Sequence, residues 1–385
     1  MLSWRPFRKE DQFVSLANAF LVELPCPMNI TWAWNFGSLL GFCLGVQIVT
    51  GLMLAMHYHN GAIEAFDSVC HIHRDVFGGW LLRLLHANSA SGFFVFIYLH
   101  IFRGVYYGGY SLVKVWMIGI SILFLLMAAS FVGYVLPFGQ MSFWGATVIT
   151  NLISAIPYIG IDVVYWIWGG FAVGDATILR FFVFHFLLPF VIALFVVVHL
   201  IYLHESGSSN PLGVFSDGMK VRFHPYYIYK DLLGIIVYFM LLMVLCMMYP
   251  YILGDCDNFL PANPMSTPVH IKPEWYFLWV YAILRCVPSK VGGVVLLVLA
   301  ILILGFMCFY KSLYQSMTYY PYGVLLFWVH LSDLALLTWI GGRPAEDPYY
   351  LYSQVLTLVY FSFYIILPLH MSFCDYLMEE EDMNN

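Results

Sequence analysis

The stretch LRLLHANSASGFFVFIYLHIFR, residues 82–103, sets two histidines in a segment rich in apolar side chains. The stretch FHFLLPFVIALFVVVHL, residues 184–200, repeats this arrangement. His86 and His100 are fourteen residues apart, and so are His185 and His199. Fourteen helical residues climb about 21 Å and return to within about 40° of the same helix face. Each histidine pair therefore lies on one face of a helix, at two depths.

Two such helices running in the same direction bring the first histidines together at one depth and the second histidines at another. A histidine inside a membrane is costly and marks a functional site. A single histidine here would more often be a hydrogen-bonded core residue. The repeated spacing of His86, His100, His185 and His199 instead favours two stacked haems, each with its iron bound by two imidazoles. Because both axial positions are filled, such haems carry electrons and do not bind oxygen.

The composition identifies a polytopic membrane protein. Of the 385 residues, 62% are hydrophobic and only 10% are charged, which is too few to cover a soluble surface. The net charge of −6 is spread thinly, and no basic run suggests a nucleic-acid partner. The eight cysteines form no CxxC or CxxCH motif, so we expect no disulfide framework, no zinc or iron–sulfur site, and only non-covalent haem.

Hydropathy predicts an all-α fold with eight spans, which puts both termini on one side of the membrane and makes the second and fourth spans parallel. The predicted spans are Leu39–Met56, Leu81–Ile101, Val115–Leu136, Phe181–Leu203, Leu232–Tyr251, Val291–Tyr310, Tyr322–Ile340 and Leu351–Met371. The distribution of Lys and Arg favours termini on the inner side. The long outer connections, Pro137–Arg180 and Pro250–Lys290, are rich in Trp and Tyr and are expected to contain helices that lie in the membrane interface.

We divide the chain into three regions on this basis. Residues 1–34 form an inner N-terminal segment, residues 35–210 form a four-helix di-haem bundle with outer interfacial helices, and residues 211–385 form a C-terminal four-helix region. The outer loop 250–290 of the last region carries Pro273-Glu274-Trp275-Tyr276. The mixed-charge start lacks a secretory or transit signal, so we expect a subunit that is inserted where it is made.

Glycines with the same spacing support the bundle. Gly37 and Gly51 in the first span are fourteen residues apart, and so are Gly119 and Gly133 in the third. A wide macrocycle needs positions without a side chain on the neighbouring helices. Glycine is common in membrane helices, so one such pair alone would mean little. Three arginines within a turn or two of the histidines could hold haem propionates or could simply extend to the interface: Arg83, Arg103 and Arg180.

Several motifs along nearly the whole chain form a highly specific set. They are Trp34-Asn35-Phe36-Gly37-Ser38, Arg83 to Asn88, Gly133-Tyr134-Val135-Leu136-Pro137 with Gly139-Gln140-Met141-Ser142, Trp144 to Leu152, His224-Pro225-Tyr226-Tyr227, Pro273-Glu274-Trp275-Tyr276 and Leu337 to Gly342. With these motifs the chain closely resembles the cytochrome b family, the haem-bearing subunits of quinol:cytochrome c oxidoreductase (respiratory complex III).

The resemblance implies roles for particular residues. His86 and His185 would bind an outer, low-potential haem b, and His100 and His199 an inner, high-potential one. Quinol would be oxidised in an outer pocket at Tyr134, Gly145, Glu274 and Tyr281. A carboxylate at an apolar edge suits this reaction, because desolvation raises its pKa toward the working pH. Without the family motif, Glu274 would be interpreted as an exposed loop acid.

The resemblance also implies an inner site for quinone reduction. It would use His204, Ser208, Lys230 and Asp231, because a histidine beside a carboxylate can deliver the two protons that a reduced quinone takes up. From sequence alone, Lys230 and Asp231 could equally be ordinary charges near a helix end.

The implied function is an enzyme subunit that is active only within its complex. It would oxidise quinol outside, pass one electron across the membrane through the two haems, and reduce quinone inside, with proton translocation. The implied partners are a Rieske-type iron–sulfur protein, a c-type cytochrome subunit, other complex III subunits, ubiquinol and ubiquinone, and membrane lipid, in a dimeric complex. The expected location is the mitochondrial inner membrane, with a bacterial plasma membrane as the alternative.

Some residues depart from the family pattern or have no role in it. Phe138 replaces a usual tryptophan at the mouth of the quinol pocket, and Ser209 replaces a usual asparagine beside the inner site. His330 and Asp333 could pair with a partner subunit or with each other across one helical turn. The histidines of the first outer connection are expected to be surface residues: His57, His59, His71 and His73.

Two other classes of protein remain as alternatives. A secondary transporter that relays protons through intramembrane histidines would explain the spans but not the matched glycines. A haem-free assembly scaffold would leave all four histidines unexplained. The plastid relative of the family is split after the fourth span and has one more residue between its fourth-span histidines, which argues against that branch.

Overall fold

The computed structural model describes residues 6–384, with side chains up to Glu379. Eight helices within this range are long and apolar enough to cross a membrane, which confirms the predicted all-α polytopic fold. They are α3 (Phe36–Ala55), α5 (Gly79–Tyr106), α6 (Val113–Val135), α9 (Asp175–Ser206), α10 (Tyr226–Met248), α12 (Lys290–Phe306), α13 (Gly323–Gly341) and α14 (Tyr349–Asn384).

Several helices extend beyond the predicted apolar windows. One case is α9, which begins at Asp175 rather than Phe181 and ends at Ser206. Its first turn is fixed by Thr177, whose hydroxyl accepts a hydrogen bond from the Gly174 N–H at 3.1 Å and donates one to the Trp168 carbonyl at 2.8 Å. Hydropathy registers the apolar centre of a helix and misses such polar ends.

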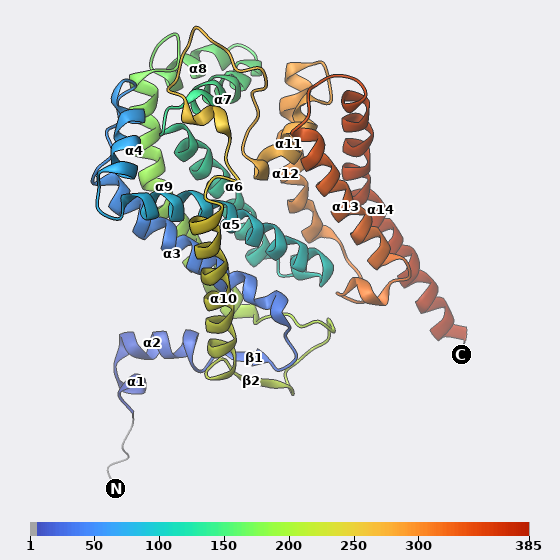
Figure 1. Ribbon diagram of the computed structural model, residues 1–385. Coiled ribbons are helices and arrows are strands. Elements are labelled where there is room, and N and C mark those ends of the chain that lie inside the picture. Colours follow the sequence, from blue (N-terminus) through green and yellow to red (C-terminus); the bar gives the residue numbers. More distant parts are fainter. Residues whose placement is uncertain (1–5, 385) are drawn as a thin grey trace.

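The chain has two distinct ends along the helix axes (Figure 1). The inner end holds α1, α2 and the last turns of α14, and the outer end holds α4, α7 and α8. Because α5 and α9 both start at the outer end, they run in parallel, as the histidine spacing requires.

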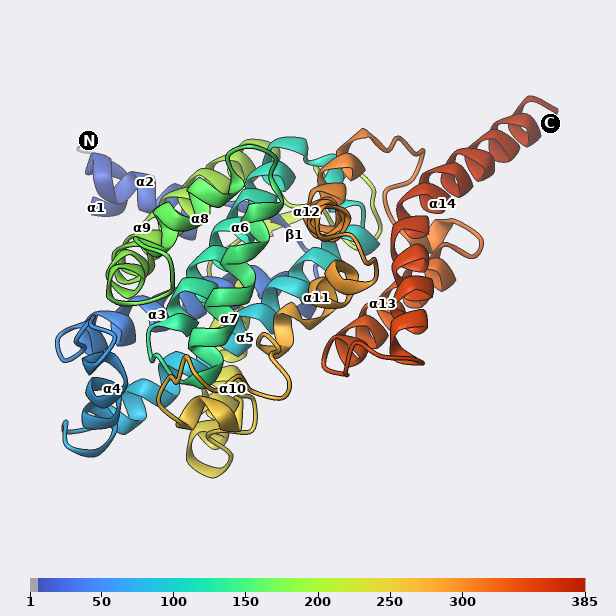
Figure 2. The same cartoon turned by 90° about the horizontal axis from the view of Figure 1, so that it is seen from above.

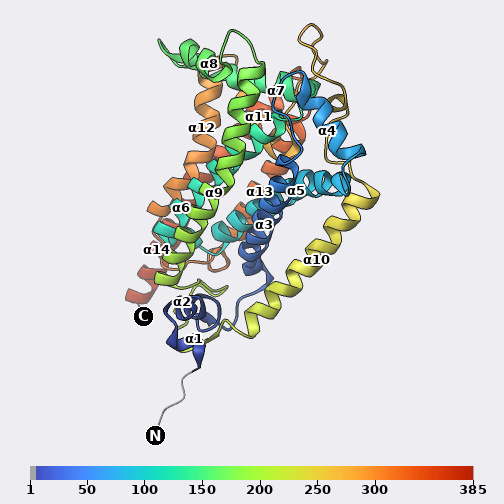
Figure 3. The ribbon, with the colours of Figure 1, turned by 90° about the vertical axis from the view of Figure 1, so that its left-hand side faces the viewer.

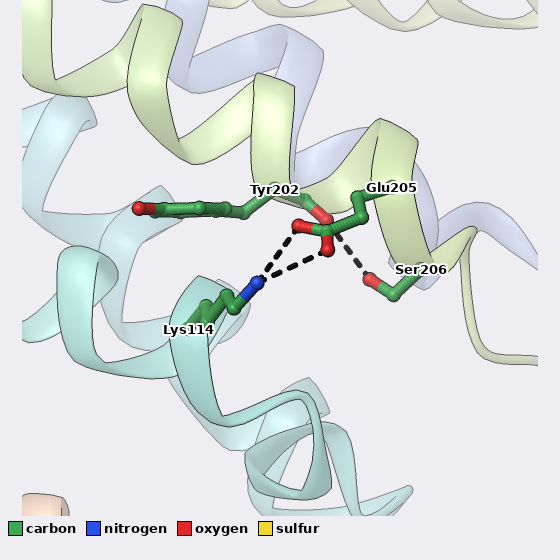
Figure 4. Close-up of polar contacts among 4 residues, drawn as sticks. All are labelled: Lys114, Tyr202, Glu205 and Ser206. Carbon is green, nitrogen blue, oxygen red and sulfur yellow. Dashed lines mark hydrogen bonds and ion pairs between the residues drawn. The ribbon is translucent and has the colours of Figure 1, made fainter.

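The four-helix bundle consists of α3, α5, α6 and α9. In it α6 packs mainly on α9, and α3 packs mainly on α5. At the inner end, Lys114 at the start of α6 binds both carboxylate oxygens of Glu205 near the end of α9, at 3.0 and 3.1 Å, and its ammonium lies 5.2 Å from the ring centre of Tyr202 (Figure 4). This exposed clamp joins the inner ends of the two helices.

The C-terminal helices pack around the bundle. Helix α10 lies along its outside against α3 and α5 (Figure 3), while α13 and α14 form a pair on the side away from α4 and α9 (Figure 2). The short helix α11 (Leu278–Arg285) packs on both α12 and α13. One buried apolar cluster connects the two halves, and in it Phe94 of α5 stacks on Tyr276 with ring centres 4.0 Å apart. The predicted boundary at residues 210 and 211 falls between α9 and β2 and stays a prediction.

Interfacial helices occupy the long outer connections, as predicted. The first connection holds α7 (Gln140–Asn151) and α8 (Gly160–Trp168). A further outer helix, α4 (Glu64–Arg74), was not predicted. It buries Ala65 and Ile72, and its acidic residues lie in the first turn and its basic residues in the last, which complements the helix dipole.

The inner end carries small elements that hydropathy does not register. Helices α1 (Phe7–Glu10) and α2 (Gln12–Leu21) precede a two-stranded antiparallel sheet of β1 (Pro25–Pro27) and β2 (Lys220–Arg222), with Cys26 opposite Val221. Residues 1–5 of the predicted N-terminal segment lie outside the described residues. Seven 3₁₀ helices complete the described fold: η1 (Trp32–Asn35), η2 (Gly109–Ser111), η3 (Leu152–Ala155), η4 (Cys256–Phe259), η5 (Trp275–Phe277), η6 (Met307–Phe309) and η7 (Met317–Tyr319).

Candidate cofactor and substrate sites

The four bundle histidines form two facing pairs. The ring centres of His86 and His185 lie 6.0 Å apart toward the outer end, and those of His100 and His199 lie 6.3 Å apart toward the inner end. An imidazole nitrogen binds a metal at about 2 Å and lies about 1 Å from its ring centre, so two imidazoles on one ion have ring centres about 6 Å apart. Both separations therefore fit one metal between each pair.

The outer histidines are oriented by hydrogen bonds at Nδ1. Nδ1 of His185 donates to the Ala129 carbonyl at 2.8 Å. Nδ1 of His86 lies 2.8 Å from the Thr50 hydroxyl, which itself donates to the Val46 carbonyl at 2.6 Å. Because that hydroxyl has one hydrogen, it accepts from His86. Both rings therefore leave Nε2 free as an acceptor, the arrangement typical of metal-binding histidines.

The inner histidines have different surroundings. Nδ1 of His199 faces the Val115 carbonyl without forming a normal hydrogen bond. The Arg103 guanidinium lies over Trp34 at 5.1 Å, with Nη2 3.4 Å from Nδ1 of His100, and its buried Nε has no partner among the described residues. A buried cation with an unpaired N–H is suited to binding an anionic group beside this pair.

The four spaced glycines each face a different histidine. A Cβ atom added at Gly37 would lie 3.7 Å from His100, and one at Gly119 would lie 3.4 Å from His199. At Gly51 it would approach His86 to 3.2 Å, and at Gly133 it would collide with the ring of His185. The glycine spacing thus has a physical reason in this structure, because each imidazole occupies the space that a side chain would fill.

A cavity of about 510 Å³ surrounds the outer pair. His86 and His185 line it together with Gly51 and Gly133. Arg83 also lines it, close enough to Glu274 for its charge to act on that carboxyl. The volume is within the range of cofactor pockets, and the lining is mostly apolar. The tautomers, the ring separation and the glycines fit a haem at the outer pair, and the ring separation and the glycines also fit one at the inner pair.

Arg180 lies elsewhere. Its Nη1 donates to the carbonyls of Trp166 and Ile167 at the end of α8, and its guanidinium stacks over the Trp166 ring. It therefore stabilises the interfacial helix, and among the described residues it makes no hydrogen bond to a histidine.

A second, smaller cavity of about 180 Å³ brings together all four residues of the predicted quinol pocket. Tyr134 lies in the last turn of α6, Gly145 lies in α7, Glu274 precedes η5 and Tyr281 lies in α11. Glu274 and Tyr134 also line the large outer cavity, so the two cavities share a wall. Residues more than a hundred positions apart in the chain thus meet beside the outer histidine pair.

Burial sets the acidity of Glu274. Desolvation raises the pKa of its carboxyl from 4.5 to about 7, assisted by the charge of Asp255. Hydrogen bonding from Tyr134 and the charges of Arg83 and Lys272 act in the opposite direction, and Lys272 itself forms an ion pair with Asp255 at 3.2 Å. Glu274 can therefore accept and release a proton near neutral pH.

Sequence reasoning missed Arg285, which supports this pocket. Its Nη2 donates to the carbonyls of Ile340, in the last turn of α13, and Arg343, just after that helix, at 2.6 Å each. Its guanidinium lies 4.8 Å over the Tyr281 ring. This tie holds α11 on α13. A basic residue at the end of a short loop helix was the available signal, but its partners are remote in sequence.

The predicted inner residues lie at the inner end in two groups. Asp231 accepts hydrogen bonds from Asn35 at 2.9 Å and Ser38 at 2.7 Å, and Lys230 donates to the Ile30 carbonyl at 2.8 Å. Asp231 is thus tied to α3 rather than being a simple charge at a helix end. Asn35 and Ser38 belong to the motif Trp34-Asn35-Phe36-Gly37-Ser38, but nothing in the sequence pairs them with Asp231.

The second inner group holds the other two residues. His204 is exposed and its ring centre lies 4.4 Å from that of Phe20, and Ser208 is half-buried. No hydrogen bond or ion pair between described residues joins His204 or Ser208 to Lys230 or Asp231.

The remaining expectations concern cysteines, outer histidines and Phe138. All eight cysteines are free. His71 pairs with Asp75 at 3.0 Å, and His73 lies 3.0 Å from the Tyr251 hydroxyl; among the described residues they form no metal-like cluster with other histidines. Phe138 is buried and has a positive φ of 51°, at the turn between α6 and α7.

Comparison with known proteins covers both halves of the chain. A family model described as cytochrome b/b6/petB matches residues 21–207, and one described as cytochrome b(C-terminal)/b6/petD matches residues 261–361. Among solved structures, one titled "Hyperthermophilic respiratory Complex III" contains a similar chain with a TM-score of 0.88 and 30% sequence identity. The match covers 95% of this chain and 98% of that one.

Proposed function

The chain belongs to the cytochrome b family and is an electron-transfer subunit of a respiratory quinol–cytochrome c oxidoreductase, and we propose that it oxidises quinol at its outer cavity and reduces quinone at its inner end. The observation that carries this proposal is the shared wall of Glu274 and Tyr134 between the small cavity and the outer histidine cavity. A substrate in the small cavity would lie directly beside a redox cofactor.

Membership of the family implies haem b, and we propose two haems, a low-potential one at His86 and His185 and a high-potential one at His100 and His199. When bound, they supply one-electron transfer between the two ends of the bundle. Thr50 and the Ala129 carbonyl hold the outer imidazoles in the metal-binding tautomer. Arg83 and Arg103 are the proposed partners of haem carboxylates, whereas Arg180 is already engaged by α8.

The protein's own residues handle protons and orientation at the outer pocket. Quinol gives up two electrons and two protons on oxidation: one electron and one proton would leave to an external Rieske-type iron–sulfur protein, the Glu274 carboxylate would take the second proton, and the second electron would go to the haem that His86 and His185 would hold. Tyr134 and Tyr281 line the pocket as hydroxyl-bearing walls. Gly145 leaves its wall open, since no atom lies within 4 Å of the position that its Cβ would take. The apolar remainder excludes water, so that the proton goes to Glu274.

At the inner end we propose that His204, Ser208, Lys230 and Asp231 bind quinone and supply the two protons for its reduction. Asp231 is held in place by Asn35 and Ser38, and His204 by its contact with Phe20. Uptake of protons at this end and release at the outer end would translocate charge.

The chain is a multi-pass membrane protein within a multi-subunit complex. We further propose a dimeric complex with a c-type cytochrome subunit, ubiquinone as substrate, and the mitochondrial inner membrane as the location. Fractionation of mitochondrial and plasma membranes from the source cell tests this location, and recovery of the chain in a bacterial plasma membrane would contradict it.

A redox-poised optical difference spectrum of the purified complex, with haem quantified per chain, tests the haem proposal. We expect two b-type haems that titrate at separate potentials and become reduced on adding quinol. A single haem, or none, would contradict the four-histidine arrangement.

Two variants make this test specific. His86→Ala should remove the outer haem, whereas His71→Ala, which changes an exposed histidine of α4, should leave both haems in place. Equal haem contents in the two variants would also contradict the proposal.

A further inference from the structure

Two titratable residues lie in the buried stripe of α13, far from the histidine bundle in sequence. His330 and Asp333 are each 3% exposed, and they share that stripe with the apolar residues Phe327, Leu337 and Ile340. Both oxygens of Asp333 and Nδ1 of His330 lack hydrogen-bond partners among the described residues. They are enclosed by this chain, so they are not available to a partner subunit, and they make no direct hydrogen bond to each other.

A hydrogen-bonded chain on one side of His330 has a defined direction. It ends at the Ala300 carbonyl, which only accepts, so the Tyr360 hydroxyl donates to it at 2.6 Å. Tyr364 then donates its single hydrogen to Tyr360 at 3.3 Å. Nε2 of His330, 3.4 Å from the Tyr364 oxygen, must therefore be the donor in that contact. The ring of His330 is fixed in this orientation by stacking on Phe363, with ring centres 4.0 Å apart and planes within 8°.

The direction of these hydrogen bonds determines which kind of partner Nδ1 of His330 requires. With Nε2 carrying the hydrogen, Nδ1 is an acceptor, and an ionised Asp333 would offer only further acceptors. Residues three apart on a helix have neighbouring side chains. The unpartnered groups would then be acceptors facing one another in an apolar core, an arrangement that is costly and that one added proton removes.

The titratable groups packed around the pair carry no positive charge that could neutralise an ionised Asp333. They are tyrosines: Tyr360 and Tyr364 from α14, with Tyr98 of α5 beside Tyr360, and Tyr310, which donates to the Tyr364 carbonyl at 2.5 Å. Trp279 joins Tyr98 to Tyr360, through a hydrogen bond of 3.1 Å to the Tyr98 hydroxyl and a tilted ring contact with Tyr360 at 5.7 Å. The described surroundings provide no Lys or Arg partner.

We propose that Asp333 and His330 form a proton-binding site in the membrane core, in which Asp333 is a neutral carboxylic acid that donates through ordered water to Nδ1 of His330. The proposed site binds one proton and ordered water. The proton lies on a carboxyl oxygen of Asp333, and the water accepts from it and donates to Nδ1. Buried water of this kind satisfies polar atoms that have no protein partner. Neither His330 nor Asp333 lines the outer histidine cavity or the small cavity beside it.

Infrared spectroscopy of the purified complex tests the proposal. The difference spectrum of wild type minus Asp333→Asn should contain the C=O band of a protonated carboxylic acid and no carboxylate bands. In His330→Leu this band should move to higher frequency, because the acid loses its acceptor. Carboxylate bands in the first spectrum, or an unmoved band in the second, would overturn the proposal.

Measurements of stability provide a second test if other absorption hides the infrared band of Asp333. Asp333→Asn replaces a neutral acid with a neutral amide of the same shape, so haem content and melting temperature should stay at wild-type values. A marked fall would mean that a charged Asp333 holds the fold, and would overturn the proposal. Ser332→Ala, which changes an exposed neighbour on α13, is the control and should alter neither the infrared bands nor the melting temperature.

Discussion

The outer and inner ends of this molecule are built differently. At the outer end, the histidine pair is fixed by two hydrogen bonds at Nδ1, its glycines approach the rings most closely, and the adjoining pocket is closed by α11 and η5. At the inner end, Nδ1 of His199 has no normal hydrogen bond and the glycines leave more space. The candidate quinone residues there lie in two groups with no bond between them.

The two ends should therefore differ in how well they tolerate amino-acid substitutions. The outer site is formed within one chain by contacts that leave little room, so that small changes should remove a cofactor or stop a reaction. The inner site depends more on exposed residues such as His204 and on single ties such as those of Asp231, so that comparable changes should have smaller effects.

The largest effect is expected for Gly133→Ala. The new Cβ would collide with the ring of His185, whereas Gly37→Ala would place its Cβ 3.7 Å from His100, an ordinary contact. We expect Gly133→Ala to lose the outer haem and retain about half of the wild-type haem content, because a close-packed site cannot absorb the added methyl group. Gly37→Ala should keep both haems. Haem quantified per chain checks this, and two haems in Gly133→Ala would contradict it.

Glu274→Gln should have the next largest effect. The amide cannot accept the quinol proton, so steady-state quinol oxidation should fall by about 10²-fold, within the usual range for loss of a general base, with both haem spectra unchanged. Asp231→Asn keeps an oxygen for Asn35 and Ser38 and should slow turnover much less. Equal losses in the two variants would remove the contrast between the ends.

The pH dependence of quinol oxidation should reflect Glu274. Because burial raises its pKa to about 7, the carboxyl is neutral below that pH and cannot accept a proton. The rate should therefore rise about tenfold per pH unit on the acid side and level off above pH 7. Initial rates measured across this range check the profile. The residual activity of Glu274→Gln should lack this step, and an unchanged step would assign it to another group.

Thr50→Val should affect the outer haem selectively. Removing the hydroxyl deprives Nδ1 of His86 of its partner, and loss of such a partner typically weakens metal binding by about 10-fold or more. We expect a shifted outer-haem potential and easier loss of that haem in detergent, with the inner haem unchanged. Ser121→Ala removes another helix hydroxyl, bonded only to the Met117 carbonyl, and should change neither potential.

The smallest effect is expected at the exposed inner clamp. Lys114→Met removes the ion pair to Glu205, and exposed pairs contribute less than about 1 kcal/mol. The melting temperature of the complex should fall slightly and less at high salt. A loss of the inner haem in this variant would show that the clamp also sets the spacing of His199.

The features of this protein that depend only on residues close together in the chain were predictable from its sequence. Apolar windows predicted the spans, and the repeated fourteen-residue spacing predicted which histidines and glycines share a helix face. The helix α4 was missed because it is short and polar, and the inner helix α2 because it is apolar but too short to span a membrane. The quinone residues were named through family motifs, because nothing local in the sequence distinguishes Glu274 from a loop acid.

By itself, then, the sequence determined the class of protein, the number of spans and the four histidines, because helical periodicity and hydropathy are properties of neighbouring residues. Only the tertiary structure decided that Glu274, Tyr134, Gly145 and Tyr281 line one cavity and that Arg180 is engaged by α8. It also decided that Asp333 and Nδ1 of His330 are enclosed without hydrogen-bond partners among the described residues. These facts depend on contacts between residues far apart in the chain, and burial, which sets the pKa of Glu274, exists only once those segments have packed together.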